Sequence, residues 1–231
     1  MDLILSFLSK TFAFDENSPL LFTQFYFWAF FAIVFAIFSL IHSKRLLRNT
    51  FLFIVSLFFY YKTSGLFVLL LIFATISDFF IAKHVYRSEK ELHRKLFVGL
   101  SVCINLLVLS YFKYSYFFVD LVNSLFGTAF QVHDYFAAIG NAVTGSNRFS
   151  VDQIILPVGI SFYTFQTISY TMDVYRRRIA PVKNILDYGF YVSFFPQLVA
   201  GPIVRAAEFI PQVYKPYFLG RRQFGIAIFW I

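Results

Sequence analysis

The sequence predicts an all-α, polytopic membrane protein. Apolar residues make up 59% of the chain and charged residues only 14%, and a soluble domain of 231 residues could not bury that much apolar surface. The apolar residues fall in long runs, and Lys and Arg gather in short clusters between them, as in the cytoplasmic loops of membrane proteins. We therefore expect about five to six transmembrane or re-entrant helical segments and one interfacial helix.

Three apolar segments occupy the first part of the chain. Leu20–Ile41 has the length of about 20 residues that a spanning helix needs. Phe51–Tyr61 and Leu66–Ala82 follow, separated by the short break Lys62–Gly65. Because the first of these two segments is short, we expect the pair to form a helical hairpin that crosses out and back.

The middle of the chain is less regular. Leu96 to about Val119 predicts another span, and Lys113 interrupts its end. Phe117–Ala142 has mixed polarity, and two interpretations fit it about equally well: a helix lying on the outer leaflet, or a plain extracellular loop.

Two further apolar segments contain helix breakers. Ile154–Tyr175 predicts a span that Pro157 and Gly159 break near its start. Leu186–Val204 is too short to span comfortably and contains three breakers, Pro196, Gly201 and Pro202. Basic residues flank it on both sides, which predicts a re-entrant turn entered from the cytoplasm, with a short tilted span as the alternative.

The distribution of charge orients the predicted spans. Lys and Arg cluster at residues 44–48, 83–95, 176–183 and 205–222, which places these segments in the cytoplasm. The N-terminal residues carry more Asp and Glu than Lys, as does the segment 113–152. The pattern therefore predicts a multi-pass protein of the cytoplasmic (inner) membrane with its N-terminus outside.

Polar residues within Ile154–Tyr175 are the main candidates for a functional site. Ser161, Tyr163 and Gln166 predict either the wall of a polar tunnel or hydrogen bonds between helices, and we weigh these two interpretations equally. No catalytic base accompanies them, so a serine-nucleophile mechanism is not indicated. Gln197, in the predicted re-entrant turn, could bond backbone groups that the turn frees, or face a substrate.

Two carboxylates lie inside predicted spans, where an unpaired charge is costly. Asp78 lies about one turn from Lys83, and Asp173 lies about one turn from Arg176. The simpler interpretation is that each pairs with a basic loop at the membrane surface. The functional interpretation is that each lines a vestibule on the cytoplasmic side.

Several other kinds of site are not indicated. The net charge of +8 does not form a basic face separate from apolar stretches, which argues against nucleic acid as a partner. Cys103 is the only cysteine, and the sequence has no zinc spacing or nucleotide-binding glycine loop, so we expect no metal ion and no bound cofactor. The four histidines are expected to lie in solvated loops or at the interface; they are His42, His84, His93 and His133.

Three stretches resemble a known family. They are RNTFLFIVSLFFYYK from Arg48, LPVGISFYTFQTISYTMDVYRR from Leu156, and FFPQLVAGPIVR from Phe194. They are similar to the membrane-bound O-acyltransferases, in the alginate O-acetyltransferase-like branch, and the resemblance runs from about Leu46 to the end of the chain. Pro157, Gly159, Pro196, Gly201 and Pro202 belong to these motifs.

The resemblance implies acyl transfer at a membrane. A thioester or carrier-linked donor would supply an acyl group, expected to be acetyl, on the cytoplasmic side through a tunnel across the bilayer. The acceptor would be a hydroxyl of an exported polysaccharide, or a partner that carries the acyl group outward. The implied partners are periplasmic or surface acetyl-transfer proteins.

The family's catalytic histidine lies downstream of the FFPQLVAGPIVR motif, and this sequence ends at Ile231, within the apolar run that begins at Phe224. We therefore assign no catalytic residue and expect residues 1–231 to be the N-terminal portion of a single membrane domain, incomplete at the C-terminus and inactive alone. The sequence could be a fragment or a shortened relative. Two other function classes stay open: a transporter or flippase-like subunit, suggested by the broken helices, and a non-catalytic docking partner.

Overall fold

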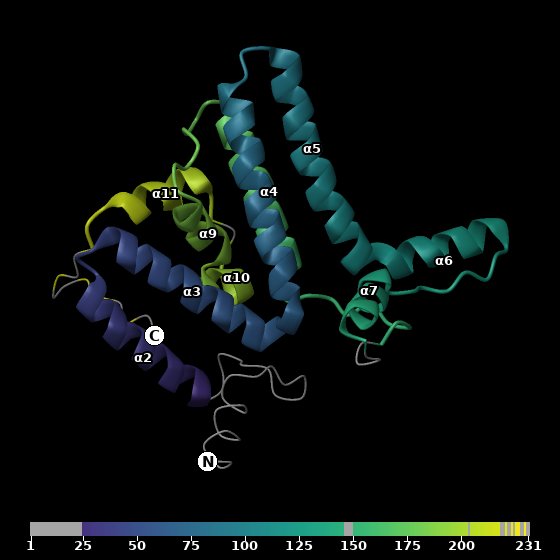
Figure 1. Ribbon diagram of the computed structural model, residues 1–231, viewed down its shortest axis with the longest axis horizontal. Coiled ribbons are helices and arrows are strands. Elements are labelled where there is room, and N and C mark those ends of the chain that lie inside the picture. Colours follow the sequence, from purple (N-terminus) through teal and green to yellow (C-terminus); the bar gives the residue numbers. More distant parts are fainter. Residues whose placement is uncertain are drawn as a thin grey trace.

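The computed structural model describes residues 25–145, 150–202 and 204–217, together with the single positions 220, 223, 225, 226 and 229. Every regular element in these residues is helical, which confirms the all-α class (Figure 1). The N-terminal charges used for orientation, and most of the apolar run Phe224–Ile231, lie outside the described residues.

Three helices form the centre of the fold (Figure 1). α4 (Val68–Arg87) and α5 (Glu91–Leu109) are antiparallel neighbours joined by a short connection, and α8 (Ile160–Tyr175) packs against both. Their shared core is fully buried and contains large side chains such as Leu71, Ile160 and Tyr170. Helices that are distant in sequence therefore pack together around α8.

A second group of helices covers one side of this centre. α3 (Arg45–Ser64) packs on α9 (Ile185–Ser193), and α11 (Ala206–Tyr214) contacts α8 and α9. α10 (Phe195–Ala200) is a short helix between α9 and α11. α2 (Phe25–Ile41) lies on α3, where Phe27 and Phe59 meet Phe195 of α10 in an aromatic cluster.

The predicted hairpin breaks at the expected place but opens into a corner. α3 ends at Ser64, Gly65 takes a positive φ of 59°, and a short 3₁₀ turn, η1 (Gly65–Phe67), leads into α4. α3 then diverges from α4 (Figure 1) and packs on α9 instead. The reason is that α3 buries polar side chains, including Asn49, whose partner Asp187 lies on α9.

The predicted break at Lys113 is also present. Residues Ser110–Tyr114 form a π-helical turn, η2, after which α6 (Ser115–Phe126) bends away from the centre (Figure 1). α6 ends at Phe126 and is followed by Gly127, whose backbone is left-handed, and α7 (Tyr135–Thr144) begins where the Asp134 carboxylate accepts two backbone N–H bonds. The mixed segment Phe117–Ala142 is thus two helices joined by an extended link and not a plain loop, and a position of these helices on the outer leaflet stays a prediction.

Two helical runs are long and apolar enough to cross a membrane by length and composition, Arg45–Arg87 and Glu91–Phe126. The predicted span Ile154–Tyr175 is shortened, because α8 begins only at Ile160 after the Pro157 turn. The segment Leu186–Val204 is divided between α9 and α10. The number of membrane crossings stays a prediction.

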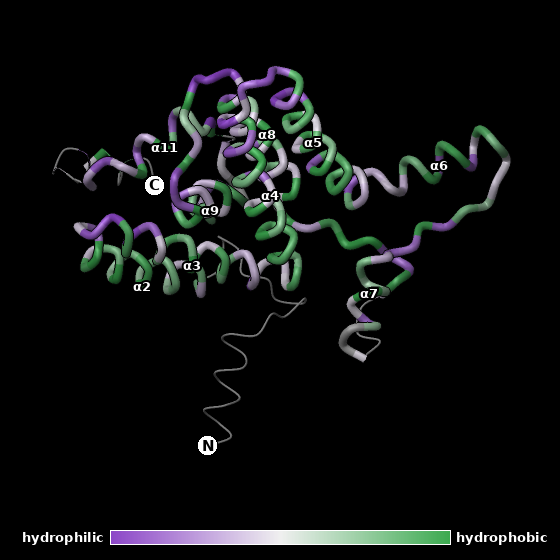
Figure 2. Tube along the Cα trace, turned by 45° about the horizontal axis from the view of Figure 1, so that its top comes forward, coloured by the Kyte–Doolittle hydropathy of each residue, from purple (hydrophilic) through white to green (hydrophobic). Residues whose placement is uncertain are grey.

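Hydrophilic residues gather at one end of the central helices. Figure 2 shows them at the α4–α5 connection and along the loop that follows α8, while α2 and α6 are largely hydrophobic. These hydrophilic positions contain two of the basic clusters that the sequence analysis placed in the cytoplasm, residues 83–95 and 176–183.

Candidate functional site

α8 begins at a tightly constrained turn. Gly159 has a left-handed backbone with φ of +73°, and a Cβ at this position would lie 2.6 Å from the carbonyl oxygen of Leu198. The backbone N–H of Val158 donates to the Ser64 hydroxyl at 3.3 Å, and Pro157 is buried just before this turn. The predicted breakers therefore set the start of α8 and bring it against α10 and the α3–α4 corner.

The turn after α9 uses the other predicted breakers. Pro196 lies in the first turn of α10, where a proline is tolerated because its missing N–H would have no partner within the helix. Gly201 follows α10 and approaches Gln197 closely, since a Cβ at Gly201 would lie 2.5 Å from the Gln197 Cα. Pro202 is exposed at the end of this turn.

Three of the predicted tunnel residues share one buried face of α8. Tyr163, Gln166 and Asp173 are 1%, 3% and 6% exposed. The Gln166 amide donates to the backbone carbonyl of Tyr191 at 2.7 Å, and the Tyr191 hydroxyl donates to the Val204 carbonyl at 3.2 Å. For Gln166 the geometry is that of a hydrogen bond between helices, one of the two interpretations that the sequence left open.

The other two predicted tunnel residues lie elsewhere. Ser161 is half-buried, and its hydroxyl accepts a hydrogen bond from the Lys113 ammonium at 3.3 Å. Gln197, on α10, is 9% exposed, and its amide nitrogen has no hydrogen-bond partner among the described residues. Tyr163, Gln166 and Asp173 thus lie along one buried face of α8, and the role of Gln197 stays a prediction.

The centre of the site is a buried polar network that the sequence analysis missed. Asp78 of α4 is fully buried and accepts hydrogen bonds from the Ser101 hydroxyl and, at 2.7 Å, from the Asn105 amide, both on α5. The Thr167 hydroxyl of α8 donates to Asn105 Oδ1 at 3.0 Å. One carboxylate therefore links all three central helices. The signal available in the sequence was the set of small polar residues inside apolar runs.

The two carboxylates singled out from the sequence behave differently. The expected pairing of Asp78 with Lys83 is wrong, because the Lys83 ammonium donates to the Lys183 carbonyl at 3.2 Å and lies over the Phe79 ring. Asp78 points instead into the helix interface. Asp173 does meet the basic loop, and its Oδ1 lies 3.6 Å from the Arg178 guanidinium.

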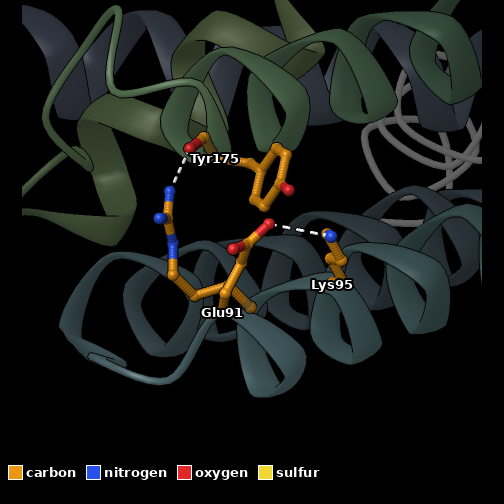
Figure 3. A network of polar contacts seen from close by, with 4 residues as sticks. Glu91, Lys95 and Tyr175 are labelled. Carbon is orange, nitrogen blue, oxygen red and sulfur yellow. Dashed lines mark hydrogen bonds and ion pairs between the residues drawn. The ribbon is translucent and has the colours of Figure 1, made fainter.

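The end of α8 is fastened to the start of α5. The Arg94 guanidinium donates to the backbone carbonyl of Tyr175 and lies 4.9 Å from the centre of its ring. On the same turns of α5, Glu91 and Lys95 form an ion pair of 2.8 Å (Figure 3). Because this pair is exposed, we expect it to contribute little to stability. The Arg94 contact fixes the C-terminal end of α8 against α5.

A second buried polar cluster joins α3, α9 and α11. The Arg48 guanidinium donates to the carbonyls of Val213 at 2.6 Å and Lys215 at 3.3 Å, at the end of α11. The Asn49 amide donates to the Asp187 carboxylate of α9 at 2.7 Å. Asp187 and Val213 therefore both lie beside the first turn of α3. The chain leaves this end of α3 along α9 and comes back to the same end along α11.

Tyr214 lies beside this cluster. Its ring faces the Arg45 guanidinium, 5.1 Å from the ring centre. Burial raises the pKa of the Tyr214 hydroxyl above its usual value, and the nearby Asp187 carboxylate raises it further.

We predict that Arg48→Gln lowers the free energy of unfolding by about 2 kcal/mol, because the buried Val213 carbonyl of α11 and the part-buried Lys215 carbonyl after it lose a charged donor. Thermal unfolding in detergent micelles measures the change, and limited proteolysis should show faster cleavage around residues 201–205. Arg45→Gln is the matched control, since Arg45 is exposed and its contact with Tyr214 should be worth less than about 1 kcal/mol. Equal losses in the two variants would contradict the prediction.

The remaining candidates do not form a site in the described part of the chain. His84 and His93 are exposed, and His133 lies at the surface beside Tyr135. The His42 ring contacts the Ser39 carbonyl at the end of α2. No group of three His, Cys, Asp or Glu residues suited to a metal ion occurs among the described residues.

An open apolar groove of about 640 Å³ lies between α5, α6 and α7. Its lining includes Leu107, Tyr111, Phe118 and Phe136. None of the predicted tunnel residues lines this groove.

Comparison with curated proteins connects this architecture to a chemistry. A protein named probable alginate O-acetylase, from Pseudomonas aeruginosa, is 35% identical over 168 residues, which are 71% of this chain and 29% of that protein. A peptidoglycan O-acetyltransferase from Helicobacter pylori is 29% identical over 220 residues, 81% of this chain and 38% of that protein. A probable alginate O-acetylase from Azotobacter vinelandii is 40% identical over 113 residues, 49% of this chain and 20% of that protein.

The chain belongs to the membrane-bound O-acyltransferase family. The resemblance to its alginate O-acetylase branch, predicted from the motifs around α8 and α10, is confirmed. No family model and no solved structure matches the sequence, so the assignment rests on the curated relatives. The chain spans about three tenths of the length of the Pseudomonas alginate O-acetylases that it matches.

Proposed function

We propose that this chain is the N-terminal portion of a membrane O-acetyltransferase that acetylates hydroxyls of an exported polysaccharide, directly or through a partner that carries the acetyl group outward. One observation carries the proposal. Relatives named for two different polymers, alginate and peptidoglycan, align with 71% and 81% of this chain. What the two names share is O-acetyl transfer to a polysaccharide of the cell envelope.

The proposed reaction takes its acetyl group from a thioester or carrier-linked donor on the cytoplasmic side. The acceptor hydroxyl oxygen forms a bond with the acetyl carbon, the carbon–sulfur bond of the thioester breaks, and the hydroxyl proton leaves with the thiol. The proposed partners are periplasmic or surface acetyl-transfer proteins. The protein would cross the cytoplasmic membrane several times with its N-terminus outside.

The arrangement of the helices supports this placement. The runs Arg45–Arg87 and Glu91–Phe126 have the length and hydropathy of membrane helices. The chain enters through α9 and returns through α11 to the same end of α3, which supports the re-entrant interpretation of Leu186–Val204. In this proposal α8 and α9 form one wall of the donor path, Tyr163 and Gln166 are buried within that wall, and Gln197 lies at the turn.

We propose further that the chain has no transfer activity by itself. It corresponds to 29–38% of the relatives that align with most of it, and none of its described histidines lies in the polar network around α8. Its contribution is structural: it holds the motif helices in place for the catalytic part of the domain.

Deleting the gene that encodes this chain should remove ester-linked acetate from one envelope polysaccharide. The measurement is acetate released by mild base from purified exopolysaccharide and, separately, from peptidoglycan. Reintroducing the intact gene should restore it, whereas a copy with Pro196→Ala and Gly201→Val should restore less. Unchanged acetate in both polymers would contradict the proposed function. Acetyl transfer by the purified 231-residue chain would contradict the separate claim that the chain is inactive alone.

A further inference from the structure

The outer surfaces of α4 and α5 carry two exposed apolar stripes. Each follows helical spacing, so its members lie above one another on one side of the helix. On α4 the stripe consists of Leu69, Phe73, Ile76 and Phe80, and on α5 it consists of Leu92, Leu96, Leu100 and Leu107. Both stripes run to the end of the molecule where α4 connects to α5.

Basic side chains cluster at the end of the molecule where α4 connects to α5. We call them the basic rim; its members are Lys83, Arg87, Lys90, Arg176, Arg177 and Lys183. Two contacts hold the rim together across the α4–α5 connection and the loop after α8. Lys83 donates to the Lys183 carbonyl at 3.2 Å, and the Arg177 guanidinium lies 5.3 Å from the centre of the Tyr86 ring. Figure 2 shows these two hydrophilic segments next to each other.

The rim keeps an excess of positive charge. Of the carboxylates near it, Glu91 is paired with Lys95 and Asp173 with Arg178. Glu89 is the remaining one, on the connection between α4 and α5. Near the six cations of the rim, Glu89 is therefore the one carboxylate outside these two ion pairs.

One member of the rim has an unusual backbone. Arg177 is the only non-glycine residue with a positive φ in the described part of the chain, at 55°. It occupies the position after α8 where the Arg178 N–H bonds the Asp173 carbonyl and the Arg177 N–H bonds the Val174 carbonyl. Glycine is the usual residue there, because it adopts this conformation without strain. An arginine at this position is strained, and such strain is concentrated at functional sites.

We propose that the basic rim binds the head groups of anionic phospholipids in the cytoplasmic leaflet, while their acyl chains lie along the stripes of α4 and α5. This inference rests on the membrane placement given under the proposed function. A basic cluster at a membrane surface attracts anionic lipid, and guanidinium groups suit phosphate geometry. A soluble phosphate would contact the basic rim but not the apolar stripes. A phospholipid would contact both, because its charged head group binds the rim and its acyl chains pack along the stripes.

The test uses the purified 231-residue chain in neutral detergent micelles with equal amounts of phosphatidylglycerol and phosphatidylcholine. Native mass spectrometry counts the lipids that stay bound. We expect phosphatidylglycerol to be retained at least about tenfold over phosphatidylcholine. The variant Arg87→Gln/Arg177→Gly should bring the ratio close to one, and since glycine suits the backbone at residue 177, helix content by circular dichroism should be unchanged.

A control variant, Lys62→Gln/Lys113→Gln, removes the same number of charges from the opposite end of α4 and α5 and should keep the preference. Equal retention of both lipids by the wild type would overturn the inference, and so would a preference that survives in the rim variant. Displacement of phosphatidylglycerol by excess inorganic phosphate would also overturn it, because the site would then recognise phosphate alone.

Alkaline carbonate extraction separates this inference from the function on which it rests. A chain that carbonate removes from membranes would contradict both the membrane placement and the lipid site. A chain that resists extraction but shows no lipid preference would contradict the lipid site only.

Discussion

Replacing Asp78 with leucine should lower the free energy of unfolding by about 3 kcal/mol. The side chain is fully buried, and its carboxylate accepts from Ser101 and Asn105. Leucine has the same branched shape, is bulkier and accepts no hydrogen bond, so it leaves a hydroxyl and an amide in the interior with fewer partners. Thermal or denaturant unfolding in detergent micelles, followed by far-ultraviolet circular dichroism, measures the loss.

The same network provides its own controls. Asp78→Asn keeps one carbonyl acceptor and should cost less, about 1–2 kcal/mol. Adding Ser101→Ala and Asn105→Leu to the leucine variant removes the stranded donors and should recover part of the lost stability. A loss below about 1 kcal/mol for Asp78→Leu would show that these hydrogen bonds do not hold α4 and α5 together.

Gly159→Ala should destabilise the protein by about 3 kcal/mol, the second large effect. Two causes add. A left-handed φ of +73° strains any L side chain, and the new Cβ would lie 2.6 Å from the Leu198 carbonyl oxygen, which belongs to backbone and cannot rotate away. α8 or α10 must therefore shift, and both carry the motifs on which the family resemblance rests. The melting temperature and the rate of proteolysis at residues 201–205 report the change.

Gly99→Ala is the matched control. Gly99 lies within α5, and nothing lies within 4 Å of a Cβ placed there. Because alanine favours a helix interior over glycine by about 0.5–1 kcal/mol, this variant should be as stable as the wild type or slightly more stable. Similar melting temperatures for the two alanine variants would show that the turn before α8 is not constrained as described.

The sequence was most informative about local structure. Breaks were predicted at Lys62–Gly65, at Lys113 and at Pro157, and each lies at a helix end or an irregular turn. Proline, glycine and charge act on the backbone within a few residues, so their effects can be read without knowing the fold. The family could be recognised for the same reason, because its motifs are contiguous stretches around these breaks.

The hydrogen-bond partners of the buried side chains could not be predicted from such local sequence effects. Asp78 was expected to pair with Lys83, five positions along the same helix, but its partners are Ser101 and Asn105, 23 and 27 residues away. Arg48 was assigned to a basic loop, yet it bonds α11, 165 residues distant. Which side chains meet depends on how each helix is rotated and crossed.

The sequence alone therefore determined the helical class, the positions of the breaks and the family, because local backbone preference and contiguous motifs are enough for each of these. The tertiary structure decided that α3 leaves α4 for α9, that α8 joins α4 and α5 through Asp78, and that α9 and α11 return to one end of α3. These outcomes follow from the requirement that buried polar groups find partners, and the partners come from distant parts of the chain.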